Sequence, residues 1–330
     1  MSPVRVGDGP FRYHVEESWA KFPADGVSGE AVAVACDSHD RVYVFFRGPQ
    51  PVQIFEPNGT LVASWGEGLF KRPHGIFIAR DDTVYCTDDF DHTVRAFSPN
   101  GELRLTLGTR GQPSDTGATS TDYRTIRRSG PPFHYPTNVA QALNGDLYIA
   151  DGYGNARIHR FSADGRLIQS WGEPGRKPGQ FQVPHGIAVD DANIVYVADR
   201  ENSRIQRFTR EGMYIGEWTD VARPCQIFID REGWVYVAEL GFRAGRWPGT
   251  GTHKPGETGG RVSVFDRRGV LHARWGGGDT PCELGDFFAP HGIWIDSRGD
   301  IYVAEVTLSA GGRAGVVPGS CHTFQKFVRS

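Results

Sequence analysis

The tetrapeptide Pro-His-Gly-Ile occurs three times in the chain, and its histidines are His74, His185 and His291. Neutral imidazole is the commonest metal ligand in proteins, and three histidines with one open coordination position are typical of a catalytic zinc centre. Iron, cobalt and nickel also bind imidazole, so the pattern indicates a divalent metal more strongly than it indicates zinc. The histidines can form such a site only if the fold brings them together.

A repeated block of about 40 residues carries these histidines. In residues 183–218 an alternating apolar strand and a polar turn precede the triplet Val195-Tyr196-Val197, and two further strands end at Phe208 and Trp218. Five other blocks match this one without gaps through the first two strands. The six predicted repeats span about 31–66, 72–108, 135–172, 183–218, 223–276 and 289–327. Four short strands with glycine turns at this period predict a propeller blade.

The predicted fold class is therefore all-β, a six-bladed β-propeller of four-stranded blades that forms a single domain over residues 1–330. The sixth block ends with its third strand, near residue 327. The N-terminal stretch at about residues 12–20 resembles the fourth strands of the other blocks, so we expect it to pair with the last blade and close the ring.

The register of the repeat predicts where the three histidines lie. The first strand of a propeller blade lines the central channel, and the position ten residues before each Val-Tyr-Val triplet lies on that strand. In blades one to six this position holds Val32, His74, Thr137, His185, Cys225 and His291. Alternate blades are one third of a turn apart, so the three imidazoles should approach a common point. The alternative is that Pro-His-Gly-Ile is only the turn that begins a blade and tolerates histidine.

Three further residues could act beside a metal. Arg47 and Arg200 occupy equivalent positions after the second strands of blades one and four, where two guanidinium groups could clamp a carboxylate. Tyr153 follows Gly152 in blade three, and a phenol close to a metal and an arginine can act as a base. The alternatives are solvated arginines on turns and an aromatic side chain that covers the blade.

Three segments carry a resemblance to a known family: Asp-Gly-Tyr-x-Asn-x-Arg at 151–157, the run at 183–208 that contains Val-Ala-Asp-Arg-Glu-Asn, and Phe46-Arg47-Gly48. They resemble the lyase domain of peptidylglycine amidating enzymes. Nearly the whole chain resembles an NHL-repeat propeller. That family cleaves the C–N bond of an α-hydroxyglycine and releases an amide and glyoxylate. The resemblance implies that His74, His185 and His291 hold zinc, that Tyr153 is the base, and that Arg47 and Arg200 orient the substrate.

The chain departs from this family at two positions. Gly154 stands where the animal lyases have a disulfide cysteine, and Gly292 stands where the family has an aspartate associated with structural calcium. The second departure argues against calcium. The expected substrate is a small or short peptide-like molecule that carries a carboxylate.

Two other functions remain open at this point. The same three-histidine centre could serve a hydrolase of lactones, esters or amides, with Asp89, Glu239 or Glu305 as the proton acceptor. A non-enzymatic propeller that binds a partner is the other alternative, because a fold by itself does not determine a function.

Composition restricts the partners and the compartment. A net charge of -3 gives no attraction to nucleic acid or to an anionic membrane, and no apolar run reaches membrane-spanning length. The N-terminus lacks the apolar core of a signal peptide, so we expect a cytoplasmic protein. The sequence does not indicate an oligomeric state. The five cysteines are scattered and odd in number, and they predict neither a disulfide framework nor a thiolate zinc site: Cys36, Cys86, Cys225, Cys282 and Cys321.

Three segments exceed the repeat, at 109–134, 243–260 and 308–320. Insertions in a propeller lie over one face, where binding groups are common, although flexible surface loops are an equal alternative.

Overall fold

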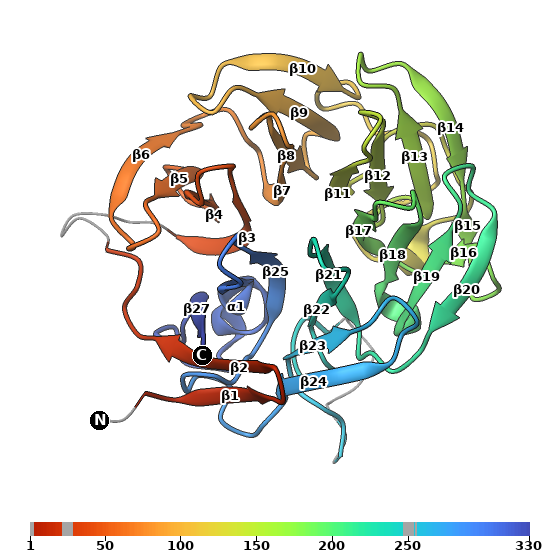
Figure 1. Cartoon of the computed structure of the whole chain (residues 1–330). Coiled ribbons are helices and arrows are strands. Elements are labelled where there is room, and N and C mark those ends of the chain that lie inside the picture. Colours follow the sequence, from red (N-terminus) through yellow and green to blue (C-terminus); the bar gives the residue numbers. More distant parts are fainter. Residues whose placement is uncertain (1–2, 22–28, 247–253, 255) are drawn as a thin grey trace. The chain divides into compact units, whose positions relative to one another are not determined.

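The computed structural model describes residues 3–21, 29–246, 254 and 256–330. Within the described residues, five antiparallel four-stranded sheets are each built from strands that follow one another in sequence, and one five-stranded sheet joins the N-terminal strands to the C-terminal ones (Figure 1). The all-β, six-bladed propeller predicted from the repeat is confirmed. The chain divides into two compact units, Gly68–Ile229 and the combination of Met1–Glu67 with Asp230–Ser330. The predicted single domain and the repeat boundaries stay predictions.

The unit Gly68–Ile229 contains three complete blades and the first strand of a fourth. Its first two blades consist of β7 (Pro73–Ile78), β8 (Val84–Asp88), β9 (Thr93–Phe97), β10 (Leu103–Leu107), β11 (Pro136–Gln141), β12 (Leu147–Asp151), β13 (Arg157–Phe161) and β14 (Leu167–Trp171). The remaining strands are β15 (Glu173–Pro174), β16 (Gln180–Phe181), β17 (Pro184–Val189), β18 (Val195–Asp199), β19 (Arg204–Phe208), β20 (Tyr214–Trp218) and β21 (Pro224–Ile229), with the short helix η2 (Arg200–Asn202) after β18. The first strands β7, β11, β17 and β21 lie side by side in this order.

The other unit contains the first and last blades. Its strands are β1 (Arg5–Asp8), β2 (Phe11–Glu16), β3 (Glu30–Cys36), β4 (Val42–Arg47), β5 (Val52–Phe55), β6 (Leu61–Trp65), β22 (Val235–Glu239), β23 (Arg261–Phe265), β24 (Leu271–Gly276), β25 (Pro290–Ile295), β26 (Ile301–Glu305) and β27 (Phe324–Arg329). The first strands β25 and β3 are neighbours here.

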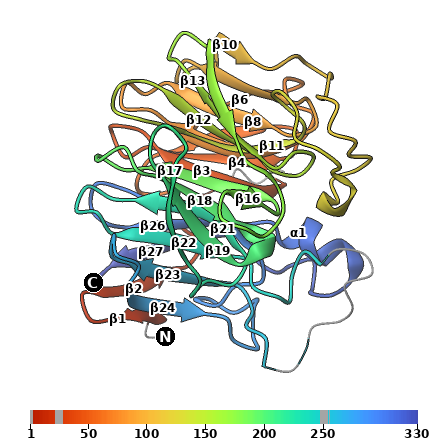
Figure 2. The same cartoon turned by 90° about the vertical axis from the view of Figure 1, so that its right-hand side faces the viewer.

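The N-terminal strand closes the last blade, as the sequence predicts. Strand β2 pairs antiparallel with β27, and Val15 stands opposite Phe327. The strand ends at Glu16, earlier than the predicted residue 20, but Trp19 is buried and its indole N–H donates to the carbonyl of Pro57 at 3.0 Å. Strand β1 adds an edge that the sequence did not predict, and it lies beside β24 in both views (Figures 1 and 2).

In the three blades that carry the repeated histidines, a buried carboxylate at the end of the second strand holds the chain that leads into the first strand of the same blade. Asp88 accepts hydrogen bonds from the backbone N–H groups of Lys71 and Arg72, at 2.7 and 3.0 Å. Asp199 accepts from Gln182 at 2.7 Å, and Glu305 accepts from Phe288 and Ala289 at 3.0 and 3.2 Å. In all three blades the donors lie one or two positions before Pro-His. The Ala-Asp or Ala-Glu pair after Val-Tyr-Val therefore positions the histidine strand of its own blade.

Two of the three predicted insertions have defined structure. Segment 109–134 contains the helix η1 (Tyr123–Thr125), and segment 308–320 begins within α1 (Thr307–Ala310) and continues into η3 (Gly312–Ala314). Segment 243–260 lies partly outside the described residues. No helix within the described ranges is long and apolar enough to span a membrane.

The expectation about cysteine pairing was wrong. Cys282 and Cys321 form a disulfide, while Cys36, Cys86 and Cys225 are buried free thiols. No spacing rule identifies the pair, because the two cysteines are 39 residues apart in sequence and meet only when blade six folds. Disulfides persist mainly in oxidising compartments. The cytoplasmic location stays a prediction, and the disulfide argues against it.

Removal of the disulfide should destabilise the protein. For a loop of this length, the double variant Cys282→Ala/Cys321→Ala should lose about 2 to 4 kcal/mol of unfolding free energy, because the unfolded chain gains freedom. Urea titration with and without reductant measures the effect. Reductant should destabilise the wild type and leave the double variant unchanged. Equal midpoints for oxidised wild type and the double variant would show that the bond contributes nothing.

Candidate metal and active site

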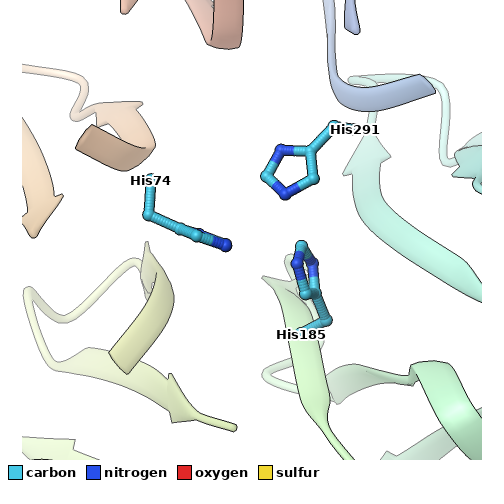
Figure 3. A group of neighbouring side chains, drawn as sticks. All are labelled: His74, His185 and His291. Atoms are coloured by element: carbon cyan, nitrogen blue, oxygen red, sulfur yellow. The ribbon is translucent and has the colours of Figure 1, made fainter. Parts of the chain in front are cut away.

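The three repeated histidines form a buried group. One ligand atom from each of His74, His185 and His291 lies within 4.8 Å of those of the other two, and the three side chains point toward one another (Figure 3). Their exposed fractions are 1%, 1% and 5%. Three buried imidazoles of this spacing could hold a metal ion.

A backbone carbonyl sets the orientation of each imidazole. The Nδ1 atom of His74 lies 2.7 Å from the carbonyl oxygen of Thr137, and Nδ1 of His185 lies 2.9 Å from that of Cys225. In the other unit, Nδ1 of His291 lies 2.7 Å from the carbonyl oxygen of Val32. A carbonyl oxygen only accepts, so Nδ1 carries the proton and Nε2 keeps its lone pair in all three rings. This tautomer is the one that a metal ion requires.

The carbonyls come from the blades without a histidine, at the same register position. Thr137, Cys225 and Val32 occupy the positions equivalent to the histidines in blades three, five and one. The glycine of the motif permits this approach: a Cβ on Gly75 would lie 2.6 Å from the Thr137 oxygen, and one on Gly186 would lie 2.4 Å from the Cys225 oxygen. The glycine of the motif therefore leaves space for the backbone carbonyl that accepts the hydrogen bond of the neighbouring imidazole.

Tyr153 lies against two of the imidazoles. Its hydroxyl oxygen is 3.3 Å from Nε2 of His74 and 3.1 Å from Nε2 of His185. The hydroxyl has one proton and can donate to only one of these two lone pairs at a time. Two lone pairs that converge in this way are the donor set of a cation, so the residues fit the metal that the sequence indicates.

Arg200 is the cation beside Tyr153. Its Nη1 donates to the Tyr153 hydroxyl at 3.0 Å, and its Nε donates to Glu201 at 2.8 Å. Arg223 also pairs with Glu201, at 2.9 Å, so two guanidinium groups share one carboxylate and the cluster keeps a net positive charge. Burial lowers the pKa of Arg200, but Tyr153 and Glu201 outweigh it and the pKa is raised. Arg200 therefore stays charged although only 4% of it is exposed.

Arg47 lies in the unit that contains His291. Its Nη1 donates to Glu30 at 3.1 Å and to the hydroxyl of Ser309 at 3.0 Å. The backbone N–H of Ser309 also donates to Glu30, at 2.6 Å. The insertion at 308–320 thus orients this arginine. A joint clamp of Arg47 and Arg200 on one carboxylate stays a prediction.

The three carboxylates considered as bases for hydrolysis already have partners. Asp89 pairs with Arg72 at 2.6 Å, and Glu239 pairs with Arg261 at 2.8 Å. Glu305 holds the backbone before His291, as described above. All three are fully buried, and their contacts are those of structural carboxylates.

The insertion at 109–134 supports the Tyr153 segment, a role that the sequence did not reveal. Thr116 is fully buried, and its hydroxyl donates to the carbonyl of Gly154 and lies 2.9 Å from Nδ1 of His134. The His134 ring fills the space beside Gly154, where a Cβ would lie 2.4 Å from it. Gly154 was the one signal for this contact in the sequence, because the space left by an absent side chain must be filled by a neighbouring residue.

Comparisons with known proteins identify relatives of this chain. A family model for the NHL repeat matches residues 181–208. NHL repeat-containing protein 3 of Homo sapiens is 30% identical over 312 residues, which cover 89% of this chain and 81% of that protein. Peptidyl-alpha-hydroxyglycine alpha-amidating lyase 1 of Drosophila melanogaster is 32% identical over 234 residues, which cover 59% of this chain and 40% of that protein.

Solved structures share the fold. A gluconolactonase of Xanthomonas campestris superposes with a TM-score of 0.62 at 13% identity, covering 100% of this chain and 96% of that one. A streptogramin B lyase superposes with a TM-score of 0.59 at 15% identity, covering 96% of this chain and 98% of that one. At these identities the likeness concerns the fold alone.

Replacement of a metal-binding histidine should abolish metal retention. We expect about one divalent metal per wild-type chain and none in His185→Ala, because two imidazoles leave the ion poorly held. Mass spectrometry of protein purified without a histidine tag measures both, and His39→Ala, at a surface turn, is the control. Wild type that neither contains nor takes up metal would contradict the assignment.

A methyl group on the motif glycine should have a similar effect without removing a ligand. Gly186→Ala places its Cβ against two backbone atoms, the Cys225 oxygen at 2.4 Å and the Gln226 Cα at 2.9 Å, so the carbonyl must move away from His185. We expect at least tenfold weaker metal binding, measured by chelator competition. Gly319→Ala is the control, since no atom lies within 4 Å of its Cβ. Unchanged affinity in Gly186→Ala would show that the carbonyl does not orient the imidazole.

Proposed function

The chain belongs to the family of NHL repeat-containing protein 3, and from this premise we propose that it is a metal-dependent lyase that cleaves N-substituted α-hydroxyglycines into an amide and glyoxylate. The observation that carries the proposal is the hydroxyl of Tyr153, which lies within hydrogen-bond distance of two metal-binding imidazoles and of Arg200. Similarity to the amidating lyases supports the reaction type.

The side chains of the site have distinct parts in this reaction. His74, His185 and His291 would hold the metal, for which we propose zinc, and a bound divalent ion supplies Lewis-acid polarisation of substrate oxygens. Tyr153 accepts the proton of the substrate hydroxyl as the C–N bond breaks. Arg200, with the net positive charge of its cluster, attracts the substrate carboxylate, and Arg47 is the second arginine proposed for that carboxylate.

Burial suits this chemistry. Tyr153 and Arg200 are 8% and 4% exposed, so water competes little with the substrate for their hydrogen bonds. The substrate is a small or short peptide-like molecule with a carboxylate, and we propose no role for calcium, nucleic acid or membrane.

Hydrolysis of a lactone, ester or amide on the same histidines is the second candidate. The fold similarity to a gluconolactonase permits it, but Asp89, Glu239 and Glu305 are each held by other groups. A hydrolase in which the bound metal would activate water would not need the Tyr153 hydroxyl and would keep its activity in Tyr153→Phe, whereas the lyase would lose it.

The proposed lyase predicts release of glyoxylate from N-benzoyl-α-hydroxyglycine. Tyr153→Phe should lower kcat by about 10²- to 10⁴-fold, because the general base is removed while the ring is kept. Glyoxylate is measured by coupled reduction, and metal content is measured in parallel to show that the histidine site is intact. Tyr214→Phe, on an outer strand, is the matched control. Absence of glyoxylate with metal-loaded wild type would rule out this substrate class, and saturable lactone or ester cleavage would then favour the hydrolase.

A further inference from the structure

Arg72 is an additional arginine near Tyr153 that is not part of the clamp predicted for Arg47 and Arg200. It directly precedes Pro73-His74, and its guanidinium carbon lies 4.1 Å from the ring centre of Phe90 and 5.8 Å from that of Tyr153. The equivalent residues before the other two Pro-His pairs are Val183 and Ala289, which carry no charge. Among the three histidine blades only blade two has an arginine at this position, although Arg223 occupies it before Pro224-Cys225 in blade five. Arg72 lies on the border of the Tyr153 site.

The guanidinium of Arg72 is fixed on one edge and open on the other. Its Nε and Nη2 donate to the same oxygen of Asp89, at 2.9 and 2.6 Å, and the ring of Phe90 lies against it. No described residue accepts a hydrogen bond from Nη1. The side chain is 27% exposed, whereas Asp89 is fully buried. An arginine held in place with unused donors is suited to bind a planar acceptor at little cost in side-chain entropy.

The charge around Arg72 differs from that around Arg200. Arg72 and Asp89 form a pair without net charge, while Arg200, Glu201 and Arg223 together keep one positive charge. A second carboxylate at Arg72 would also meet the charge of Asp89. The open edge of Arg72 therefore favours an uncharged oxygen acceptor, and the carboxylate of the substrate belongs to the cluster of Arg200.

We propose that Arg72 donates through Nη1 to the acyl carbonyl oxygen of the substrate, next to the nitrogen that departs. The inference rests on the proposed lyase activity. When the hydroxyl proton leaves, the oxygen forms the C=O of glyoxylate and the C–N electron pair moves onto nitrogen. That charge is shared with the acyl oxygen as an amidate until the nitrogen takes up a proton and the amide is complete. A donor on the acyl oxygen stabilises this charge as it develops.

This assignment places the acyl end of the substrate. Phe90 is 41% exposed beside Arg72, so an apolar acyl chain or side chain can pack against its ring. Arg72 and Phe90 thus contact the acyl end, while the Arg200 cluster binds the carboxylate end.

The test uses two inert ligands that differ only in the carbonyl, 3-benzoylpropionate and 4-phenylbutanoate. Calorimetry on wild type should give about tenfold tighter binding of the ketone, the range expected for one hydrogen bond from a charged donor. Arg72→Met should bind both equally. Arg110→Met, which removes an exposed guanidinium that pairs with Asp91, should keep the wild-type preference. A wild type without the preference, or an Arg72→Met that retains it, overturns the proposal. Because no reaction occurs, this outcome is independent of glyoxylate release.

A second variant guards against misfolding. Arg72→Met removes the ion pair of Arg72 with the buried Asp89, which can destabilise the chain, so Arg72→Met/Asp89→Asn is measured beside it. If wild type releases glyoxylate, para-substituted N-benzoyl substrates add a kinetic readout. The rate should depend more steeply on the acidity of the leaving amide in the double variant than in wild type. Equal slopes would overturn the role in leaving-group stabilisation.

Discussion

The hydrogen bond from each imidazole Nδ1 to a backbone carbonyl is the interaction on which the site depends. It fixes the tautomer, aims the Nε2 lone pair, and ties a histidine strand to the first strand of the following blade, for example His74 to Thr137. It also follows the alternation of the motif. Each histidine-bearing blade is followed by a blade that supplies the carbonyl from the same register position, so the two kinds of blade alternate.

Two arginine clusters with different net charge lie beside Tyr153. The Arg200 cluster carries net charge and is almost completely buried, so it acts on an anion with little screening. The pair of Arg72 and Asp89 has no net charge and is partly exposed, so it acts on a bound molecule through the direction of its N–H donors more than through charge. An asymmetric substrate with a charged and an uncharged end has one favourable orientation between them.

Much of the fold and of the histidine group could be predicted, because a gapless repeat converts one spacing into six equivalent positions. Val32, Thr137 and Cys225 were placed correctly in the first strands for this reason. The repeat carries no information about what differs between blades. Ser309 beside Arg47, Thr116 beside Gly154 and the partner of Cys282 all depend on insertions, whose contacts arise from packing across long sequence separations. The role of Arg72 was not predicted, because its approach to Tyr153 joins blade two to blade three and is not visible in the repeat.

The disulfide has a topological consequence for the histidine group. His291 and the whole of β25 and β26 lie between Cys282 and Cys321, so the third ligand belongs to a covalently closed ring of the chain. A single cut of the backbone anywhere inside that ring, including the surface turn at 307–320, would leave both fragments joined. Protein nicked there by a protease would keep all three imidazoles on one covalent molecule and would separate into two fragments only after reduction.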